Sequence, residues 1–125
     1  MKFDVILPGT NHIPGFYPWS HALDADGFRR ILRTLDESGF HAVSVSEHLA
    51  MPLFEVPRLG SYWQDALSTM AFAAAATQPD RFHARGRYRK IGITRTVAEP
   101  PRGVRPEQEY LDYLCWIAAE VMPEV

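Results

Sequence analysis

The sequence predicts an α/β protein with a parallel sheet, because two short apolar strands are each followed by a loop and an amphipathic helix. The strands are expected at residues 3–7 and 42–46, with a helix of more than three turns between them. A connection of that length allows the two strands to run parallel. Two strand–helix units in succession fit either a barrel or a doubly wound sheet, and the pattern leaves both open.

The first strand, Phe3 to Leu7, is stopped by Pro8-Gly9. Residues 10–21 contain prolines, glycines and aromatics without periodicity, which indicates a loop. Because this loop follows a strand, we expect four of its side chains at the sheet edge where the second strand also ends: Asn11, His12, Tyr17 and Trp19.

A helix follows the loop, with Asp24 or Asp26 as its N-cap. Gly39 supplies the left-handed residue after its last turn, and Phe40 is expected to fold back onto it in a Schellman-type stop. Its buried face is predicted from residues at the i, i+3, i+4, i+7 spacing, namely Phe28, Ile31, Leu32 and Leu35.

The second strand delivers Glu47 and His48 at its carboxyl end. In parallel sheets and barrels, groups that bind ligands or do chemistry lie just beyond the carboxyl ends of strands. These two residues are therefore the first candidates for a functional site. Judged from the residues alone, a structural role for His48, bonding a backbone group at the strand end, is the favoured interpretation.

After a loop over residues 50–60, Ser61 and Gln64 have the spacing of a capping box, which predicts a helix from Ser61 onward. The alanine-rich end of this helix, residues 73–76, would allow close packing against a sheet. Its predicted apolar stripe consists of Trp63, Ala66, Leu67, Met70, Ala71 and Ala74.

Four stretches, taken in order, resemble the N-terminal part of the luciferase-like monooxygenase family over residues 1–79. They are FDVILP, the helix end ESGF, AVSVSEHLAMP and YWQDALSTMAFAAAATQ. The resemblance implies a TIM-type (β/α) barrel of which only the N-terminal βα units are present. It also implies an oxidoreductase of monooxygenase type with a flavin (FMN) or deazaflavin (F420) cofactor and a small-molecule substrate.

Carried over by position, the resemblance gives the catalytic role to His48 and places both Glu47 and His48 against the cofactor. A histidine that titrates near neutrality can donate to an oxyanion or exchange a proton as such a cofactor changes its redox state. Trp19 and Trp63 are the candidates for walls of a substrate pocket, although packing is the commoner role for such side chains.

Composition limits the alternatives. The chain has 125 residues, which suits one modest domain, and it contains neither a run long enough to cross a bilayer nor a signal-peptide pattern. Cys115 is its single cysteine, so an internal disulfide is excluded and a cytoplasmic location is expected. The five histidines are scattered without metal-ligand spacing, and we expect no metal site.

Residues 80–125 depart from the family pattern. Residues 81–105 carry eight Lys or Arg and one Glu, and such a block cannot form a buried parallel strand because its cations would lack partners. A shifted reading frame is one explanation. Against it, Pro106 starts a segment with helical spacing that predicts an amphipathic helix over residues 106–122; its stripe is Tyr110, Leu111, Leu114, Ile117, Ala118 and Val121.

A complete barrel takes about 250 residues, and its phosphate site is built by the last strands. We therefore expect a truncated oxidoreductase that binds FMN or F420 weakly or not at all, and is weakly active or inactive alone. The alternative is a nucleic-acid or protein-binding module that uses residues 81–105, with Phe82 and Tyr88 as stacking groups. A third possibility is pairing of the sheet edge and last helix with a second copy, as a homo-oligomer.

Overall fold

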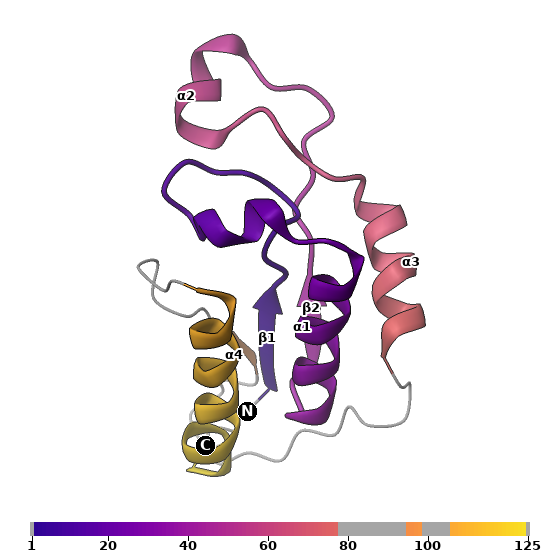
Figure 1. Ribbon diagram of the computed structural model, residues 1–125, viewed down its shortest axis with the longest axis vertical. Helices are drawn as coiled ribbons and strands as arrows, with labels where there is room; N and C mark the ends of the chain where they lie inside the picture. Colours follow the sequence, from indigo (N-terminus) through magenta and orange to yellow (C-terminus); the bar gives the residue numbers. More distant parts are fainter. Residues whose placement is uncertain (1, 78–94, 99–105, 125) are drawn as a thin grey trace.

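A computed structural model describes residues 2–77, 95–98 and 106–124 (Figure 1). Its strands are β1 (Lys2–Ile6), β2 (Ala42–Ser44) and β3 (Arg95–Val97). Its α-helices are α1 (Ala25–Glu37), α2 (Val56–Leu59), α3 (Ala66–Ala76) and α4 (Glu107–Trp116). Short 3₁₀ turns lie at Pro18–Ala22, Leu53–Glu55 and Met122–Glu124, and a π-helical turn at Ile117–Val121 continues α4.

The three strands form one parallel sheet in the order β2-β1-β3. Val5 of β1 lies opposite Val43 of β2, and Phe3 lies opposite Thr96 of β3. The predicted α/β class is therefore correct. β3 pairs with β1 and not with β2, whereas a barrel in consecutive order would place a third strand beside the second.

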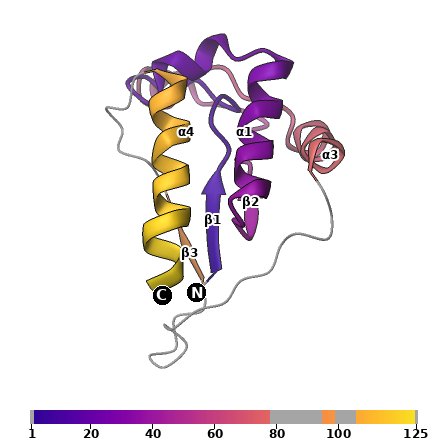
Figure 2. The same ribbon diagram turned by 60° about the horizontal axis from the view of Figure 1, so that its bottom comes forward.

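One hydrophobic core joins the sheet to its helices. β1 contributes Phe3 and Val5 to this core, and Leu7, the residue after the strand, also lies in it. Apolar residues of α1 and α4 pack against them. α1 contacts both α3 and α4, so the helices form a layer α3-α1-α4 on one face of the sheet (Figure 2). On the other face, Ile6 and Val97 remain 38% and 52% exposed.

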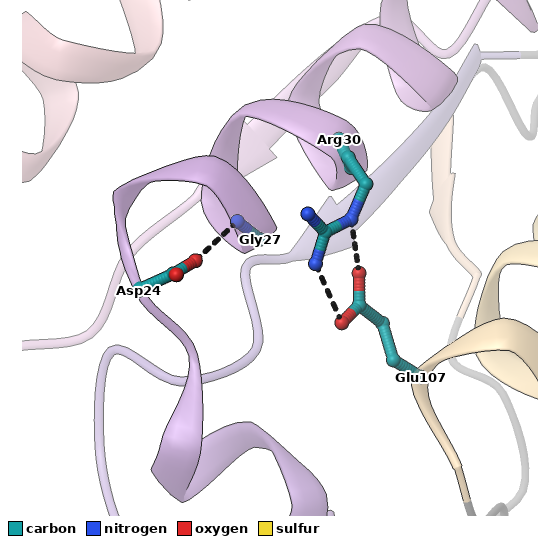
Figure 3. Close-up of polar contacts among 4 residues, drawn as sticks. All are labelled: Asp24, Gly27, Arg30 and Glu107. Atoms are coloured by element: carbon teal, nitrogen blue, oxygen red, sulfur yellow. Dashed lines mark hydrogen bonds and ion pairs between the residues drawn. The ribbon is translucent and has the colours of Figure 1, made fainter.

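The ends of α1 confirm the predicted signals. Asp24 is the N-cap, and its Oδ1 accepts a hydrogen bond of 2.8 Å from the backbone N–H of Gly27 (Figure 3). At the other end Gly39 has φ of 77°, its N–H bonds the carbonyl of Asp36, and the N–H of Phe40 bonds the carbonyl of Leu35. This is the Schellman arrangement, and the predicted stripe of α1 is buried as expected.

The prediction for the next helix was wrong in its start and its buried face. α3 begins at Ala66, because Asp65 rather than Ser61 caps it by accepting from the N–H of Ser68 at 2.7 Å. Thr69 and Ala73 face the core, while Leu67 of the predicted stripe is 81% exposed. An alanine-rich helix is apolar on nearly every side, so spacing alone does not identify the face that packs.

The C-terminal helix is confirmed. Tyr110, Leu114 and Ile117 are buried in the same core as β1 and α1. Of the basic block at 81–105, the described residues are β3 and Ala98; residues 81–94 and 99–105, including Phe82 and Tyr88, lie outside the described part of the chain.

Within the described ranges, none of the helices combines the length and the apolar character that crossing a bilayer requires.

Candidate functional site

Two loops meet at the carboxyl edge of the sheet: residues 7–24, after β1, and residues 45–65, after β2. They are joined by backbone contacts of strand type. The N–H of His12 bonds the carbonyl of Tyr62 at 3.2 Å, and the N–H of Gln64 bonds the carbonyl of Thr10 at 2.8 Å. Asn11 and Trp63 form the antiparallel bridge between these bonds. The pairing fixes one loop against the other.

Gly60 allows the second loop to approach the first. It has φ of 76°, and a Cβ placed on it would lie 2.2 Å from the carbonyl oxygen of His12. Both the left-handed backbone and the missing space require glycine at this position.

A pocket of about 120 Å³ opens beside the end of β1. Its walls are mainly apolar, with polar groups from Asn11, Ser20 and Ser46. The Asn11 side-chain amide donates to the Ser46 hydroxyl at 3.1 Å, which ties the first loop to the segment after β2. The remaining lining residues are Ile6, Leu7, Pro8, Gly9, Ile13, Phe16 and Tyr17.

The predicted pair Glu47 and His48 lies beside this pocket without lining it. β2 ends at Ser44, two residues earlier than predicted, so both side chains belong to the loop and both are exposed. The imidazole of His48 packs edge-on against Trp63, with ring centroids 4.3 Å apart and an interplanar angle of 71°.

Glu47 has a structural contact. Its Oε1 accepts a hydrogen bond of 3.4 Å from the N–H of Ala66, the first residue of α3. A carboxylate is favourable at a helix N-terminus because the unpaired N–H groups and the helix dipole present positive charge there. Glu47 therefore connects the segment after β2 to the start of α3.

The structure separates the two tryptophans that the sequence grouped as pocket walls. Trp63 is half-buried beside His48, at the loop contact. Trp19 packs instead on Tyr17 and on Tyr110 of α4, with centroid distances of 6.0 and 5.2 Å. Among the residues that the structure describes, neither buried indole N–H has a hydrogen-bond acceptor. Only Trp63 shares the neighbourhood of His48.

A stack of three rings was not found from the sequence. His12 lies between His21 and Tyr62, with both centroid distances 4.1 Å. Burial lowers the pKa of His12, and the nearby charge of His21 lowers it further. The three residues are distant in sequence and follow no motif, so only the loop pairing reveals them.

The chemistry available at this edge is hydrogen bonding from small polar groups, a solvent-facing imidazole and aromatic surface. Within residues 2–77, 95–98 and 106–124 there is no group of three His, Cys, Asp or Glu side chains that could hold a metal ion. The fold and this edge together define an α/β protein with loops of mixed aromatic and polar character over the carboxyl ends of parallel strands.

Comparison with models of known families, with curated proteins and with solved structures finds no match for this chain.

Proposed function

We propose that the chain is part of a luciferase-like oxidoreductase scaffold of monooxygenase type. Its described elements would be parts of the wall of a TIM-type barrel. The observation that carries the proposal is the position of His48, which follows β2 at the carboxyl edge of a parallel sheet and packs on Trp63 beside a pocket. This is the edge at which βα-barrel enzymes bind their ligands. A cytoplasmic location belongs to the same proposal.

The arrangement of the helices supports a barrel wall over a doubly wound sheet. Doubly wound sheets carry helices on both faces, whereas a barrel carries them on its outer face alone. Here α3, α1 and α4 form a single layer (Figures 1 and 2). In this proposal Ile6 and Val97, on the face of the sheet that none of the described helices covers, correspond to residues that point into a barrel.

The described residues do not fit a tightly held FMN or F420. The pocket of about 120 Å³ is smaller than the roughly 300 Å³ at which sites for small ligands begin. Among the described residues, neither Lys nor Arg lines this pocket, so none of them offers a cation to a cofactor phosphate. His48 itself faces solvent. We therefore propose that the chain binds either cofactor weakly or not at all by itself, and is weakly active or inactive.

An equilibrium titration tests this proposal. The full chain is titrated into FMN, and separately into F420, with cofactor fluorescence and absorbance as the signals. We expect dissociation constants weaker than about 100 µM, or no binding. His48→Gln is the variant at the proposed site, and Trp116→Phe, at an exposed position of α4, is the control. Tight binding with one cofactor per chain would overturn the proposal.

A further inference from the structure

The pocket beside the end of β1 has the size of a small ring-shaped molecule. Its volume is about 120 Å³, and we call it the β1 pocket; residues 6–9, 11, 13, 16, 17, 20 and 46 line it. An apolar cavity of about 150 Å³ holds one benzene molecule, whereas a water molecule takes roughly 30 Å³. Because the β1 pocket opens to solvent, a ring of this kind can enter it with a substituent at the mouth or inside.

Two aromatic side chains form part of the pocket wall. Phe16 and Tyr17 both line the β1 pocket, and their rings meet edge to face, with centroids 4.9 Å apart and an interplanar angle of 70°. Aromatic rings attract one another in edge-to-face and offset arrangements beyond what burial alone provides. A planar aromatic ligand therefore makes ring contacts here that an aliphatic ligand of the same size cannot make.

A buried hydroxyl group in the wall supplies a polar contact. Ser20 is 3% exposed, and within the described ranges its hydroxyl makes no hydrogen bond. Its backbone groups are already used, since the N–H bonds the carbonyl of Tyr17 and the carbonyl accepts from the N–H of Leu23. Buried polar groups without a partner are uncommon and costly. Because Ser20 lines the β1 pocket, a hydroxyl group bound there would complete its hydrogen bonding.

The charge of the wall defines the ligand further. Of the residues that the structure describes, no Asp, Glu, Lys, Arg or His lines the β1 pocket. The other polar side chains, Asn11 and Ser46, are neutral and bonded to each other. Burying a charge without a partner carries a large desolvation cost. The pocket therefore favours a neutral ligand over an ionic one.

We propose that the β1 pocket binds a small neutral aromatic molecule with one hydroxyl group, of which phenol is the simplest example. The ring lies against Phe16 and Tyr17, and its hydroxyl exchanges a hydrogen bond with that of Ser20. This inference does not depend on the proposed function, because it requires neither His48 nor a redox cofactor. The outcome of the FMN and F420 titrations has no bearing on it.

NMR titration of the full chain with phenol measures this binding. So small a ligand binds weakly, and we expect saturable shifts with a dissociation constant of about 0.1–10 mM. The shifts should concentrate at the amides of the lining residues, with nuclear Overhauser contacts from the phenol ring to Phe16 and Tyr17. Phenol is neutral at pH 7. Benzoate has the same ring but is anionic at that pH, and we expect it to bind at least about tenfold more weakly.

Ser20→Ala removes the hydroxyl with little change in volume. It is expected to weaken the binding of phenol by roughly threefold or more, and to leave that of benzene, which has no hydroxyl, within about twofold. Ser61→Ala is the matched control, because Ser61 is exposed and does not line the β1 pocket. Its affinities for both ligands should equal those of the unmodified chain.

The unmodified protein alone can overturn the proposal, whether or not a variant folds. No saturable shift at the lining residues up to about 50 mM phenol would mean that the pocket holds water only. Benzoate bound as tightly as phenol, or shifts centred on exposed apolar side chains such as Leu53 and Phe54, would overturn it equally. A loss of phenol binding that Ser61→Ala shares, or none in Ser20→Ala, contradicts the contact with Ser20.

Discussion

Arg30 of α1 and Glu107 in the first turn of α4 form a two-point ion pair that joins the N-terminal half of the chain to its C-terminal helix. Nε of Arg30 lies 3.0 Å from Oε1 of Glu107, and Nη2 lies 3.1 Å from Oε2 (Figure 3). The hydrogen bonds and charge of Glu107 raise the pKa of Arg30. Such fork-to-carboxylate geometry orients the two helices more specifically than a single contact would.

Replacing Arg30 by methionine is expected to lower the melting temperature slightly, because exposed ion pairs contribute little in water. The loss should shrink as salt is raised, since salt already screens the pair in the unmodified protein. Differential scanning calorimetry at low and high salt measures it. Arg33→Met is the control, as no ion pair is found for Arg33 among the described residues. Equal, salt-independent losses in both variants would contradict the assignment.

Leu114→Ala tests whether α4 is an integral part of the core. Leu114 is fully buried among residues of the single core cluster. Truncating such a leucine costs about 2–5 kcal/mol of unfolding free energy, through lost transfer energy and the cavity left behind.

Urea unfolding provides the measurement for this variant. Trp116→Ala, on the exposed side of the same helix, is the control and is expected to cost clearly less. A Leu114→Ala protein as stable as the unmodified chain would mean that α4 is not packed on α1 and β1.

Gly60→Ala tests the contact between the two loops. The new methyl would collide with the carbonyl of His12, and it also forces a side chain into a backbone with positive φ. Gly15→Ala is a matched control, because Gly15 has the same φ of 76° but open space around it. We expect a backbone penalty of about 1–3 kcal/mol in each variant, and a further loss from the collision only in Gly60→Ala.

The indole N–H signal of Trp63 in an NMR spectrum reports the loop contact directly. It should shift in Gly60→Ala and stay in place in Gly15→Ala. The reverse pattern, or equal destabilisation of the two variants, would show that the loops do not meet at residues 12 and 60.

The stacked histidines predict a pH dependence of stability. In the folded chain the pKa of His12 lies below its ordinary value of 6.5, first because of burial and then because of the charge of His21. Below pH 6.5 the unfolded chain therefore binds the proton more readily than the folded one. The contribution of neutral His12 to the free energy of unfolding is therefore fully present above pH 6.5. It is lost as the pH falls through the pKa that His12 has in the folded chain.

His12→Gln is expected to flatten this part of the stability profile. In NMR titrations, His21→Gln should raise the pKa of His12, because it removes the repelling charge. A pKa for His12 at or above that of an exposed histidine would contradict the stack.

Local signals predicted the fold well where one residue type decides the outcome. The sequence predicted a cap at Asp24 or Asp26, a stop at Gly39 and helical spacing around Leu114. The structure has Asp24 as the cap, Gly39 with positive φ and a buried Leu114. The start of α3 was not, because Ser61 and Asp65 are both acceptable caps and tertiary contacts decide between them. Strand order was also beyond reach, since β3 is three residues long and lies in a basic segment.

The positions of the candidate residues were predicted in part. The position of His48 and Trp63 at one edge follows from strand–loop order, and the structure brings the two rings together. The sequence grouped Trp19 with them, but Tyr110, almost a hundred residues away, provides the surface on which Trp19 packs. The stack of His12, His21 and Tyr62 depends on the pairing of two loops, and no local pattern encodes that pairing.

The proposed barrel wall depends most on β3 lying parallel beside β1, with α4 on the same helical layer as α1. The N–H of Ala98, just after β3, donates to the carbonyl of Asp4 at 2.7 Å. Hydrogen exchange followed by NMR measures this bond directly. The account predicts an Ala98 amide protected as strongly as those of β1, with nuclear Overhauser contacts between residues 95–98 and 2–5. An Ala98 amide that exchanges as fast as in an unstructured peptide, or contacts from residues 95–98 to β2 instead, would contradict it.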